Sequence, residues 1–360
     1  MSAPSHVNNF DFLRLLFSTL VLVTHSYALT GLPSHDGLWL FSTGQAVWSA
    51  LAVHGFFVIS GYLILKSLLR SGSLGEYAFK RMLRLFPALW VVVGVCVVGA
   101  FFLSDLSAPT LLHNASARAY LLNLVLRTSY FIDGVFTNNA YPRALNGSLW
   151  TVPYEMLGYL LLMPLFFVRF QKAVLRVLLL AACAGLLALQ LTGRTELSLP
   201  SLIELESEHV INLGLFFAAG SILALFPALV RHERMRPVLA AVSSVALLVT
   251  LYLGGYTQAQ YLALPVAVIT IGASNWPFLS WIRRYGDISY GVYLWGFPVQ
   301  QCLWHFLQPS LVEMMVLSIA ITWVLGYASW HLLEKHALGL KLRIRPAAAA
   351  PSLERPAVLR

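Results

Sequence analysis

The chain has 360 residues, of which 58% are hydrophobic and 11% charged, and its mean hydropathy is +0.73. Soluble domains carry about a quarter charged residues, so this composition excludes a soluble globular protein and predicts a polytopic membrane protein. The net charge of +9 comes from basic residues in the links between apolar runs, so topology explains it and we expect no nucleic-acid partner.

Apolar runs long enough to cross a bilayer recur along the whole chain. They predict an all-α fold of about ten membrane spans, near 10–30, 44–65, 87–104, 147–168, 173–191, 209–229, 237–254, 258–275, 286–307 and 312–334. The first span lacks a small-residue cleavage site after its apolar core, so we expect it to be retained. We assign 1–340 to one transmembrane domain and the Ala- and Pro-rich segment 341–360 to a basic, disordered cytoplasmic tail.

Links rich in Lys and Arg alternate along the chain with links that have few or none. The first link, 31–43, has none, whereas the next one is strongly basic. The same alternation continues through the basic links 169–176, 231–236 and 283–284 and the tail. Because cytoplasmic links carry the excess of positive charge, both termini are predicted to lie in the cytoplasm. The long outer link, 105–146, contains a short amphipathic stretch around Ala117–Leu126.

The first span carries two ionisable residues, Arg14 and His25, inside its apolar run. Eleven residue steps of 100° leave them about 20° apart around a helix and roughly 16 Å apart along it, so both lie on one face. Asp11 precedes Arg14 by one turn and is expected to pair with it. An ionisable pair inside a bilayer is costly enough to indicate function. We interpret His25 as a general base reached from outside, with a hydrogen bond that fixes helix packing as the alternative.

A basic cluster of Lys80, Arg81 and Arg84 precedes the third span. Helical spacing gathers these cations beside the inner surface, with apolar residues on the other face. Guanidinium groups bind phosphate in a bidentate manner, so the cluster suits a phosphorylated ligand. The alternative is that topology and lipid headgroups alone explain it.

The fourth span opens from the outside with the segment Asn146–Glu155, which includes Trp150. Glu155 is predicted at a depth comparable to that of His25, so the two side chains could meet across the bundle. A carboxylate beside an imidazole orients the ring and stabilises its charged form. The alternative is an interhelical hydrogen bond from a protonated Glu155.

Other polar or reactive residues inside apolar runs are interpreted as structural. His54 lies in the middle of the second span, and the pair Ser60–Gly61 indicates close helix packing. The cysteines have no spacing typical of a zinc site or a disulfide framework, so we expect buried thiols and no metal, at Cys96, Cys183 and Cys302.

Five motifs occur together along nearly the whole chain: Phe10-Asp-Phe-Leu-Arg14 with His25, Phe56-Phe-Val-Ile-Ser-Gly61, Arg81-Met-Leu-Arg84 with Pro87, Ser148-Leu-Trp with Glu155, and Gly286-Asp-Ile-Ser-Tyr-Gly-Val-Tyr-Leu294. In this combination the chain resembles the acyltransferase 3 family of membrane O-acyltransferases, which acylate sugars of surface polysaccharides and other acceptors. The spacing of Arg14 and His25, together with the Arg-x-x-Arg-x-x-Pro block, is the specific part of the resemblance.

The resemblance implies an integral protein of the bacterial inner membrane, with a cytoplasmic acyl-coenzyme A donor and an acceptor on the periplasmic side. It also implies that His25 is the catalytic residue and that Arg14, Arg81 and Arg84 are functionally required. The chain departs from the family at Gly296, where many members carry a histidine after Tyr-Leu-Trp. Any role of that histidine is therefore absent or moved.

Together, the residues and the resemblance predict an O-acyltransferase that uses acetyl-CoA. Lys80, Arg81 and Arg84 would bind its phosphates, its arm would pass Arg14, and His25 would take the proton from a sugar hydroxyl. A covalent acyl-histidine is the less favoured variant. Further predicted substrate or pore residues are Trp150, Tyr290 and Tyr293. The two tyrosines are expected to donate to the oxyanion or line the pore, with aromatic packing as the alternative.

Three alternatives remain open at this point. Intramembrane His, Arg and Glu residues also build transport pathways, so a secondary transporter or channel is the competing class. The acceptor could be a small secreted metabolite instead of a polysaccharide or lipid-linked sugar. A catalytically inactive family member could act as a scaffold, although the retained Arg14 and His25 argue against this.

Overall fold

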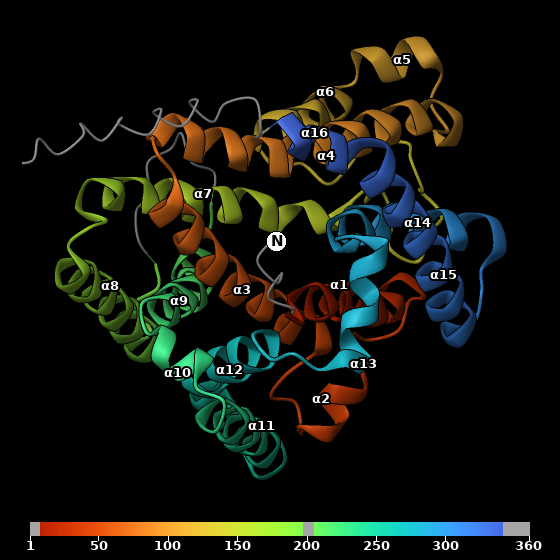
Figure 1. The fold of residues 1–360 in the computed structure, drawn as a ribbon. Coiled ribbons are helices and arrows are strands. Elements are labelled where there is room, and N and C mark those ends of the chain that lie inside the picture. Colours follow the sequence, from red (N-terminus) through yellow and green to blue (C-terminus); the bar gives the residue numbers. More distant parts are fainter. Residues whose placement is uncertain (1–7, 197–204, 341–360) are drawn as a thin grey trace, which may run out of the picture.

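The computed structural model describes residues 8–196 and 205–340, and their long helices stand side by side as a bundle (Figure 1). Within these ranges the chain forms no β-strand, and only two isolated β-bridges occur, Ser104 with Val135 and Phe131 with Ala144. The all-α prediction is therefore confirmed. The predicted tail, 341–360, lies outside the described residues.

Helix forms in each of the ten predicted span ranges. The long helices are α1 (Phe10–Leu29), α3 (Trp48–Arg70), α4 (Leu74–Leu103), α7 (Val152–Leu162), α8 (Lys172–Thr192), α9 (Ser207–Ala224), α11 (Met235–Leu253), α12 (Tyr256–Gly272), α14 (Ser289–Leu307) and α15 (Leu311–Ser329). Short 3₁₀ segments extend α7 at both ends, η2 (Gly147–Thr151) before it and η3 (Met163–Val168) after it. A π-helical turn, η5 (Trp330–Glu334), and α16 (Lys335–Gly339) continue α15.

Among the described residues, eight helical segments are long and apolar enough to cross a membrane. A ninth is added if α12 and the segment Pro277–Tyr285, which are bent by 90° at their break, are counted as one span. The predicted span 286–307 forms α14, but α14 is not among these candidates. Its side chains Gln300 and Gln301, both fully buried, lower the hydropathy of a helix that packs inside the bundle, against α1 and α15.

The third predicted span begins too late in the sequence. The sequence predicts a span at 87–104 preceded by a basic link, whereas α4 is one continuous helix of 30 residues from Leu74 to Leu103. Ser73 caps its N-terminus by accepting a hydrogen bond from the Glu76 backbone. Pro87 lies inside this helix rather than at its start. The basic cluster is therefore held on the first turns of a membrane helix, not on a loose link.

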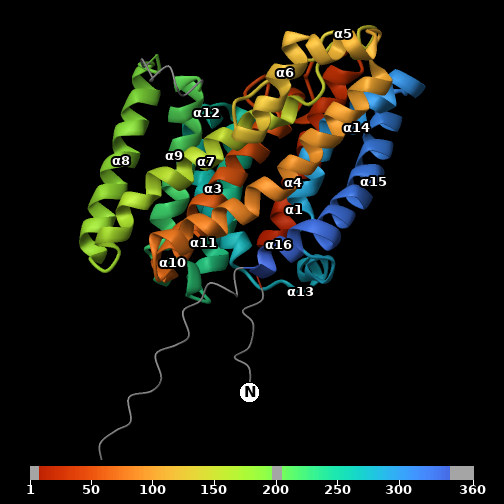
Figure 2. The ribbon, with the colours of Figure 1, turned by 90° about the horizontal axis from the view of Figure 1, so that it is seen from above.

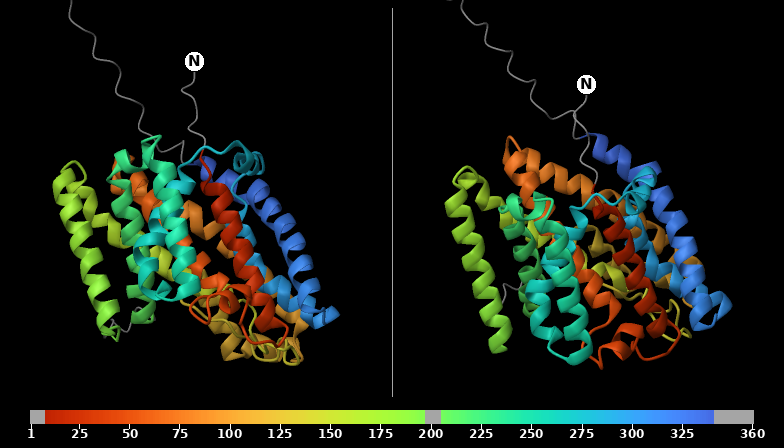
Figure 3. Two further views of the ribbon diagram at one scale, coloured as in Figure 1. Left: turned by 90° about the horizontal axis from the view of Figure 1, so that it is seen from below. Right: turned by 60° about the horizontal axis from the view of Figure 1, so that its bottom comes forward.

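The connecting segments separate into two ends of the bundle. The short helices α10 (Pro227–Arg231), α13 (Pro277–Ser280) and α16 lie at the end where α1 begins, and α5 (Ala108–His113) and α6 (Ala115–Leu121) lie at the opposite end (Figure 2). The two views of Figure 3 show α2 (Gly37–Phe41) at that opposite end as well. The amphipathic stretch expected around Ala117–Leu126 forms α6 and the 3₁₀ turn η1 (Leu122–Val125).

Two glycines allow α3 and α9 to meet backbone to backbone. A Cβ atom on Gly61 of α3 would lie 1.9 Å from the Phe217 carbonyl oxygen, and one on Gly220 of α9 would lie 2.1 Å from the Val58 carbonyl oxygen. Ser221 of α9 closes the contact by donating a hydrogen bond to the Gly61 carbonyl at 3.1 Å. The close packing predicted at Ser60–Gly61 is thus present, and small residues are what such membrane contacts require.

We predict that Gly220→Ala lowers the thermal stability of the detergent-solubilised protein, because the methyl group forces α3 and α9 apart at a cost of about 1–3 kcal/mol. Gly185→Ala in α8 is the matched control, since a Cβ there meets nothing within 4 Å. The control should raise the unfolding temperature slightly, because alanine favours a helix. Equal melting curves for the two variants would contradict the contact.

Candidate active site

A cavity of about 260 Å³ lies inside the bundle, which we call the arginine cavity. Its lining extends from Leu338 of α16, at the end where α1 begins, to Thr151 of η2. Three cationic side chains line it, and so do two carboxylates and three tyrosines: Arg14, Arg81, Arg84, Glu155, Asp287, Tyr159, Tyr290 and Tyr293. The cavity thus brings together most of the predicted site residues, which come from α1, α4, α7 and α14 and are far apart in sequence.

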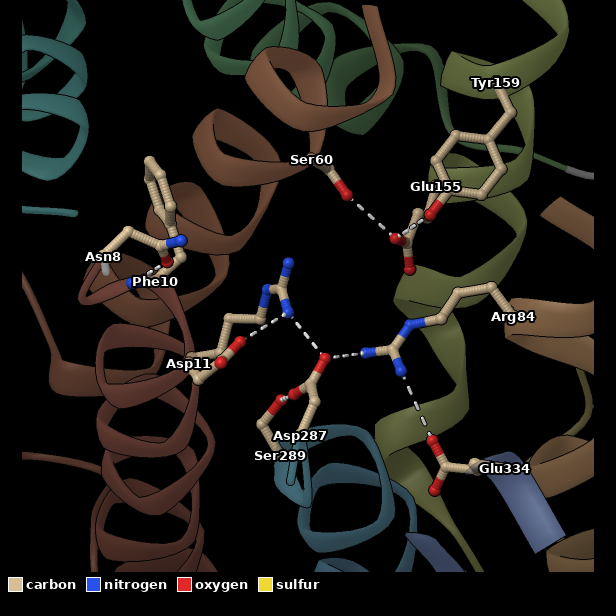
Figure 4. Close-up of polar contacts among 11 residues, drawn as sticks. Asn8, Phe10, Asp11, Ser60, Arg84, Glu155, Tyr159, Asp287, Ser289 and Glu334 are labelled. Atoms are coloured by element: carbon tan, nitrogen blue, oxygen red, sulfur yellow. Dashed lines mark hydrogen bonds and ion pairs between the residues drawn. The ribbon is translucent and has the colours of Figure 1, made fainter. Parts of the chain in front are cut away.

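The Asp287 carboxylate joins two of the arginines (Figure 4). Its Oδ2 accepts hydrogen bonds from Arg14 Nη1 at 2.5 Å and from Arg84 Nη2 at 2.7 Å. Its Oδ1 accepts from the Ser289 hydroxyl at 2.6 Å. Arg14 also contacts Asp11 Oδ1 at 3.5 Å, the pairing expected from the sequence, so its main partner is Asp287. Charges of opposite sign held this close stabilise each other where few waters can reach them.

Gly286 and η5 hold Asp287 in place. Gly286 has φ +84°, and a Cβ atom there would lie 1.9 Å from Trp330 Nε1, so both its conformation and its surroundings require glycine. The same π-helical turn contributes Glu334, which is buried and faces Arg84 Nη1 at 3.4 Å. Single π-helical turns are frequent at functional sites. Arg84 is thereby fixed between two carboxyl groups.

Arg81 is held differently from the other two arginines. Its Nη2 donates to the Ser67 hydroxyl at 3.2 Å, and its guanidinium lies over the rings of Tyr77 and Tyr159 at 5.8 and 5.6 Å. Among the described residues, no carboxylate forms an ion pair with it, and its buried Nε has no hydrogen-bond partner. Arg81 therefore keeps donor capacity that the protein itself does not use.

Lys80 lies outside the arginine cavity, unlike Arg81 and Arg84. Its ammonium pairs with Glu76 and contacts the Ser71 hydroxyl at 3.3 Å, and Lys80 is not among the residues that line the arginine cavity. The sequence groups Lys80 with Arg81 and Arg84, but adjacent helical residues point about 100° apart. Of this group of three, the structure brings only Arg81 and Arg84 to the cavity.

Glu155 and His25 lie in different surroundings. Glu155 accepts hydrogen bonds from the Ser60 hydroxyl at 2.9 Å and from the Tyr159 hydroxyl. The His25 ring packs edge to face against Phe297, with centroids 5.6 Å apart. Among the described residues no hydrogen bond joins Glu155 to His25, and His25 is not in the lining of the arginine cavity. The expected meeting of these two side chains is therefore absent from this conformation.

The two tyrosines of α14 reach the cavity with their hydroxyls engaged. Tyr290 donates to the Leu85 carbonyl at 3.0 Å, and its ring lies 5.4 Å from the Arg84 guanidinium. Tyr293 shares a hydrogen bond of 2.7 Å with Thr151. Phe297 follows Tyr293 by one helical turn, roughly 6 Å along α14. His25 therefore contacts a residue of α14 that follows the cavity-lining Tyr293 by one turn.

Trp150 faces a second hollow, of about 220 Å³, on the other side of η2. We call it the aromatic hollow, and its walls include Tyr130, Tyr141, Trp150, Tyr154, Glu206 and His209. The helix η2 therefore separates two spaces, because its first residue, Gly147, lines the hollow and its last, Thr151, lines the cavity.

His54 and the cysteines pack among other side chains, away from the arginine cavity. His54 stacks on Phe216 with ring centroids 4.1 Å apart, deep between α3 and α9. The three cysteines are free thiols, but only Cys96 is buried as expected, whereas Cys183 and Cys302 are partly exposed. Within the described ranges, no three His, Cys, Asp or Glu side chains are grouped so that they could hold a metal ion.

Sequence reasoning missed Asp287, Glu334 and Ser60 as polar members of the site. The sequence does contain features that point to Asp287, because this ionisable residue lies within the motif Gly286–Leu294 and at the start of a predicted span. Glu334 is the last residue of the predicted span 312–334 and stands beside Lys335, so the sequence gives no reason to direct it inward. Its inward direction depends on the π-helical turn, which no sequence pattern indicates.

The chain is similar to known proteins along most of its length. The family model for the acyltransferase domain matches residues 7–330. The chain is 31% identical to an O-acetyl transferase of Shigella phage Sf6, over 92% of this chain and 96% of the relative. It is 26% identical to nodulation protein 10 of Rhizobium leguminosarum bv. viciae, over 94% and 95%. It is 27% identical to the peptidoglycan O-acetyltransferase OatA of Listeria monocytogenes, over 86% of this chain and 56% of that protein. No solved structure matches the chain.

We predict that Asp287→Asn lowers the free energy of unfolding by about 3 kcal/mol, because it leaves Arg14 and Arg84 without their shared charge. Thermal unfolding in detergent measures this loss. Asp133→Asn is the control, since Asp133 is exposed in the 105–146 link. A variant as stable as the control would show that the two arginines do not depend on Asp287.

Proposed function

Because the chain belongs to the acyltransferase 3 family, we propose that it transfers an acyl group from cytoplasmic acyl-CoA to a sugar hydroxyl. The acyl group is acetyl, in keeping with the relatives named O-acetyl transferase and peptidoglycan O-acetyltransferase. The acceptor belongs to a cell-surface polysaccharide or to its lipid-linked precursor. The protein acts in the bacterial inner membrane, with the end that carries α16 in the cytoplasm.

The arginine cavity is the observation that carries this proposal. It opens between membrane helices, and it gathers Arg14, Arg81 and Arg84 toward the end predicted to be cytoplasmic. Coenzyme A carries phosphates, and guanidinium groups are the side chains best suited to bind them. Arg81 fits this role most directly, because its buried Nε has no partner and no carboxylate in the described part of the chain pairs with it, which leaves it free to donate to an anion.

His25 is the proposed general base. Its imidazole accepts the proton of the sugar hydroxyl, and the resulting oxygen nucleophile attacks the carbonyl carbon of the thioester. An ester bond forms, the carbon–sulfur bond breaks, and the leaving thiolate takes up the proton that His25 received. The hydroxyl of Tyr293, which lines the arginine cavity and shares a hydrogen bond with Thr151, is the proposed donor to the negative charge on the carbonyl oxygen.

Glu155 has a supporting role in this proposal. It accepts hydrogen bonds from Ser60 and Tyr159 on the wall of the arginine cavity. This carboxylate thereby fixes two side chains across α3 and α7. Any direct action of Glu155 on His25 requires a rearrangement when substrates bind, so we propose Glu155 as a positioning residue in the unliganded protein.

We predict that His25→Ala lowers acetyl transfer at least about a hundredfold, as expected when a general base is lost, while the protein still inserts in the membrane. Acetyl esters on the surface glycans of a producing strain, measured by NMR with and without the protein, report the activity. The control is His113→Ala, an exposed histidine of α5. Retained transfer in His25→Ala rejects the base.

We predict that Arg81→Gln weakens acetyl-CoA binding by roughly tenfold to a hundredfold, because charge-assisted hydrogen bonds to phosphate are lost. Lys80→Gln is the matched control at the neighbouring position. Its ammonium pairs with Glu76 outside the cavity, so binding should stay within about twofold. Calorimetry on the purified protein measures both. Equal losses would mean that surface charge alone attracts the donor, and no binding by the wild type would favour a transporter.

A further inference from the structure

The aromatic hollow lies at the end of the bundle that carries α5 and α6, opposite the entrance proposed for the donor. Three separate parts of the chain build it: the link after α6 with Tyr130 and Tyr141, η2 with Trp150, and the start of α9 with Glu206 and His209. Phe131 and Tyr141 are 44% and 41% exposed, so the hollow is open to the surrounding solution.

Its chemistry combines flat apolar faces with a few polar groups. The Trp150 ring lies 4.8 Å from the His209 ring and 5.8 Å from the Tyr154 ring. Glu206 contacts His209 at 3.3 Å, and its side chain is 79% exposed, so most of its carboxylate is free to accept hydrogen bonds. Burial, together with Tyr154 and Glu206, raises the pKa of Tyr130 to about 12, so this hydroxyl stays protonated. Among the described residues that line the hollow, none is Lys or Arg.

These features select the class of ligand. Aromatic faces cover the apolar face of a ring, whereas carboxylate, imidazole and hydroxyl groups exchange hydrogen bonds with hydroxyls around its rim. A negatively charged ligand would be repelled by Glu206, and the described lining of the hollow has no Lys or Arg to attract it. A neutral sugar has an apolar ring face and a rim of hydroxyls, and one ring suits a hollow of about 220 Å³.

The hollow is also next to the proposed base. Phe297, only 6% exposed, packs against His25 on one side. It also contacts two residues that line the hollow, with the Tyr141 centroid 6.0 Å away and the position of a Gly147 Cβ only 2.7 Å away. Phe297 therefore connects the wall of the hollow with the proposed base.

We propose that the aromatic hollow binds one neutral sugar unit of the acceptor, with its ring against Trp150 and its hydroxyls on Glu206 and His209. This inference rests on the proposed acyltransferase function, and it adds the place and the chemical class of the acceptor.

Saturation-transfer difference NMR on the full chain in detergent tests the inference, with methyl glycosides of glucose, galactose, mannose and rhamnose as probes. The wild type should transfer saturation to at least one probe. Trp150→Ala should weaken that binding about tenfold, the effect expected for a lost aromatic face. Glu206→Gln, at an exposed side chain that cannot unfold the protein, should weaken it several-fold. Tyr252→Ala, an aromatic residue 65% exposed on α11, is the control and should bind as the wild type.

Acetyl-CoA binding, measured on the same samples, separates this inference from the proposed function. Sugar binding that is absent from the wild type, or unchanged in both Trp150→Ala and Glu206→Gln, overturns the inference, and retained acetyl-CoA binding then leaves the proposed function standing. Loss of acetyl-CoA binding from the wild type counts against the proposed function. A probe that binds, with both variants weakened and acetyl-CoA binding intact, supports the sugar site.

Discussion

The Asp287 carboxylate is the contact on which the interior of this membrane protein depends. Arg14 from α1 and Arg84 from α4 both direct their guanidiniums into the bundle, where an unpaired charge is costly. One carboxylate at the start of α14 satisfies both, so three helices far apart in sequence are tied at one point. Gly286 makes this possible, because only glycine fits its positive φ beside Trp330. The arginines can therefore line a cavity without separating the helices around it.

A second constraint is the 3₁₀ segment η2, which divides the interior. Gly147 lines the aromatic hollow, and Thr151 lines the arginine cavity. Gly147 must be small because Phe297 packs directly on it, and Phe297 in turn contacts His25. A reaction between a donor in one space and an acceptor in the other needs only a local change at this partition. The helical bundle itself can remain fixed, which suits a protein whose helices meet through close glycine contacts such as Gly61 with α9.

Much of this architecture follows from the sequence, and the limits have physical causes. Apolar length predicts the spans, and helical period places Arg14 and His25 on one face, because both depend on local geometry. The direction of Glu155 around α7 was not predictable, and the side chain meets Ser60 and Tyr159 instead of His25. The direction in which such a side chain points depends on how the helices pack together, and the sequence does not show which helices are neighbours in space.

The cations in and beside the arginine cavity differ in how free they are to bind an anion. Arg14 and Arg84 already face Asp287, and Arg84 also faces Glu334, so an incoming phosphate would compete with carboxylates for them. Arg81 faces two aromatic rings and a hydroxyl, and within residues 8–196 and 205–340 no carboxylate pairs with its charge. The neighbouring Lys80 is neutralised by Glu76. Of these four cations, Arg81 is therefore the one that its described surroundings leave to attract an anion, while Arg14 and Arg84 hold the helices that shape the cavity around it.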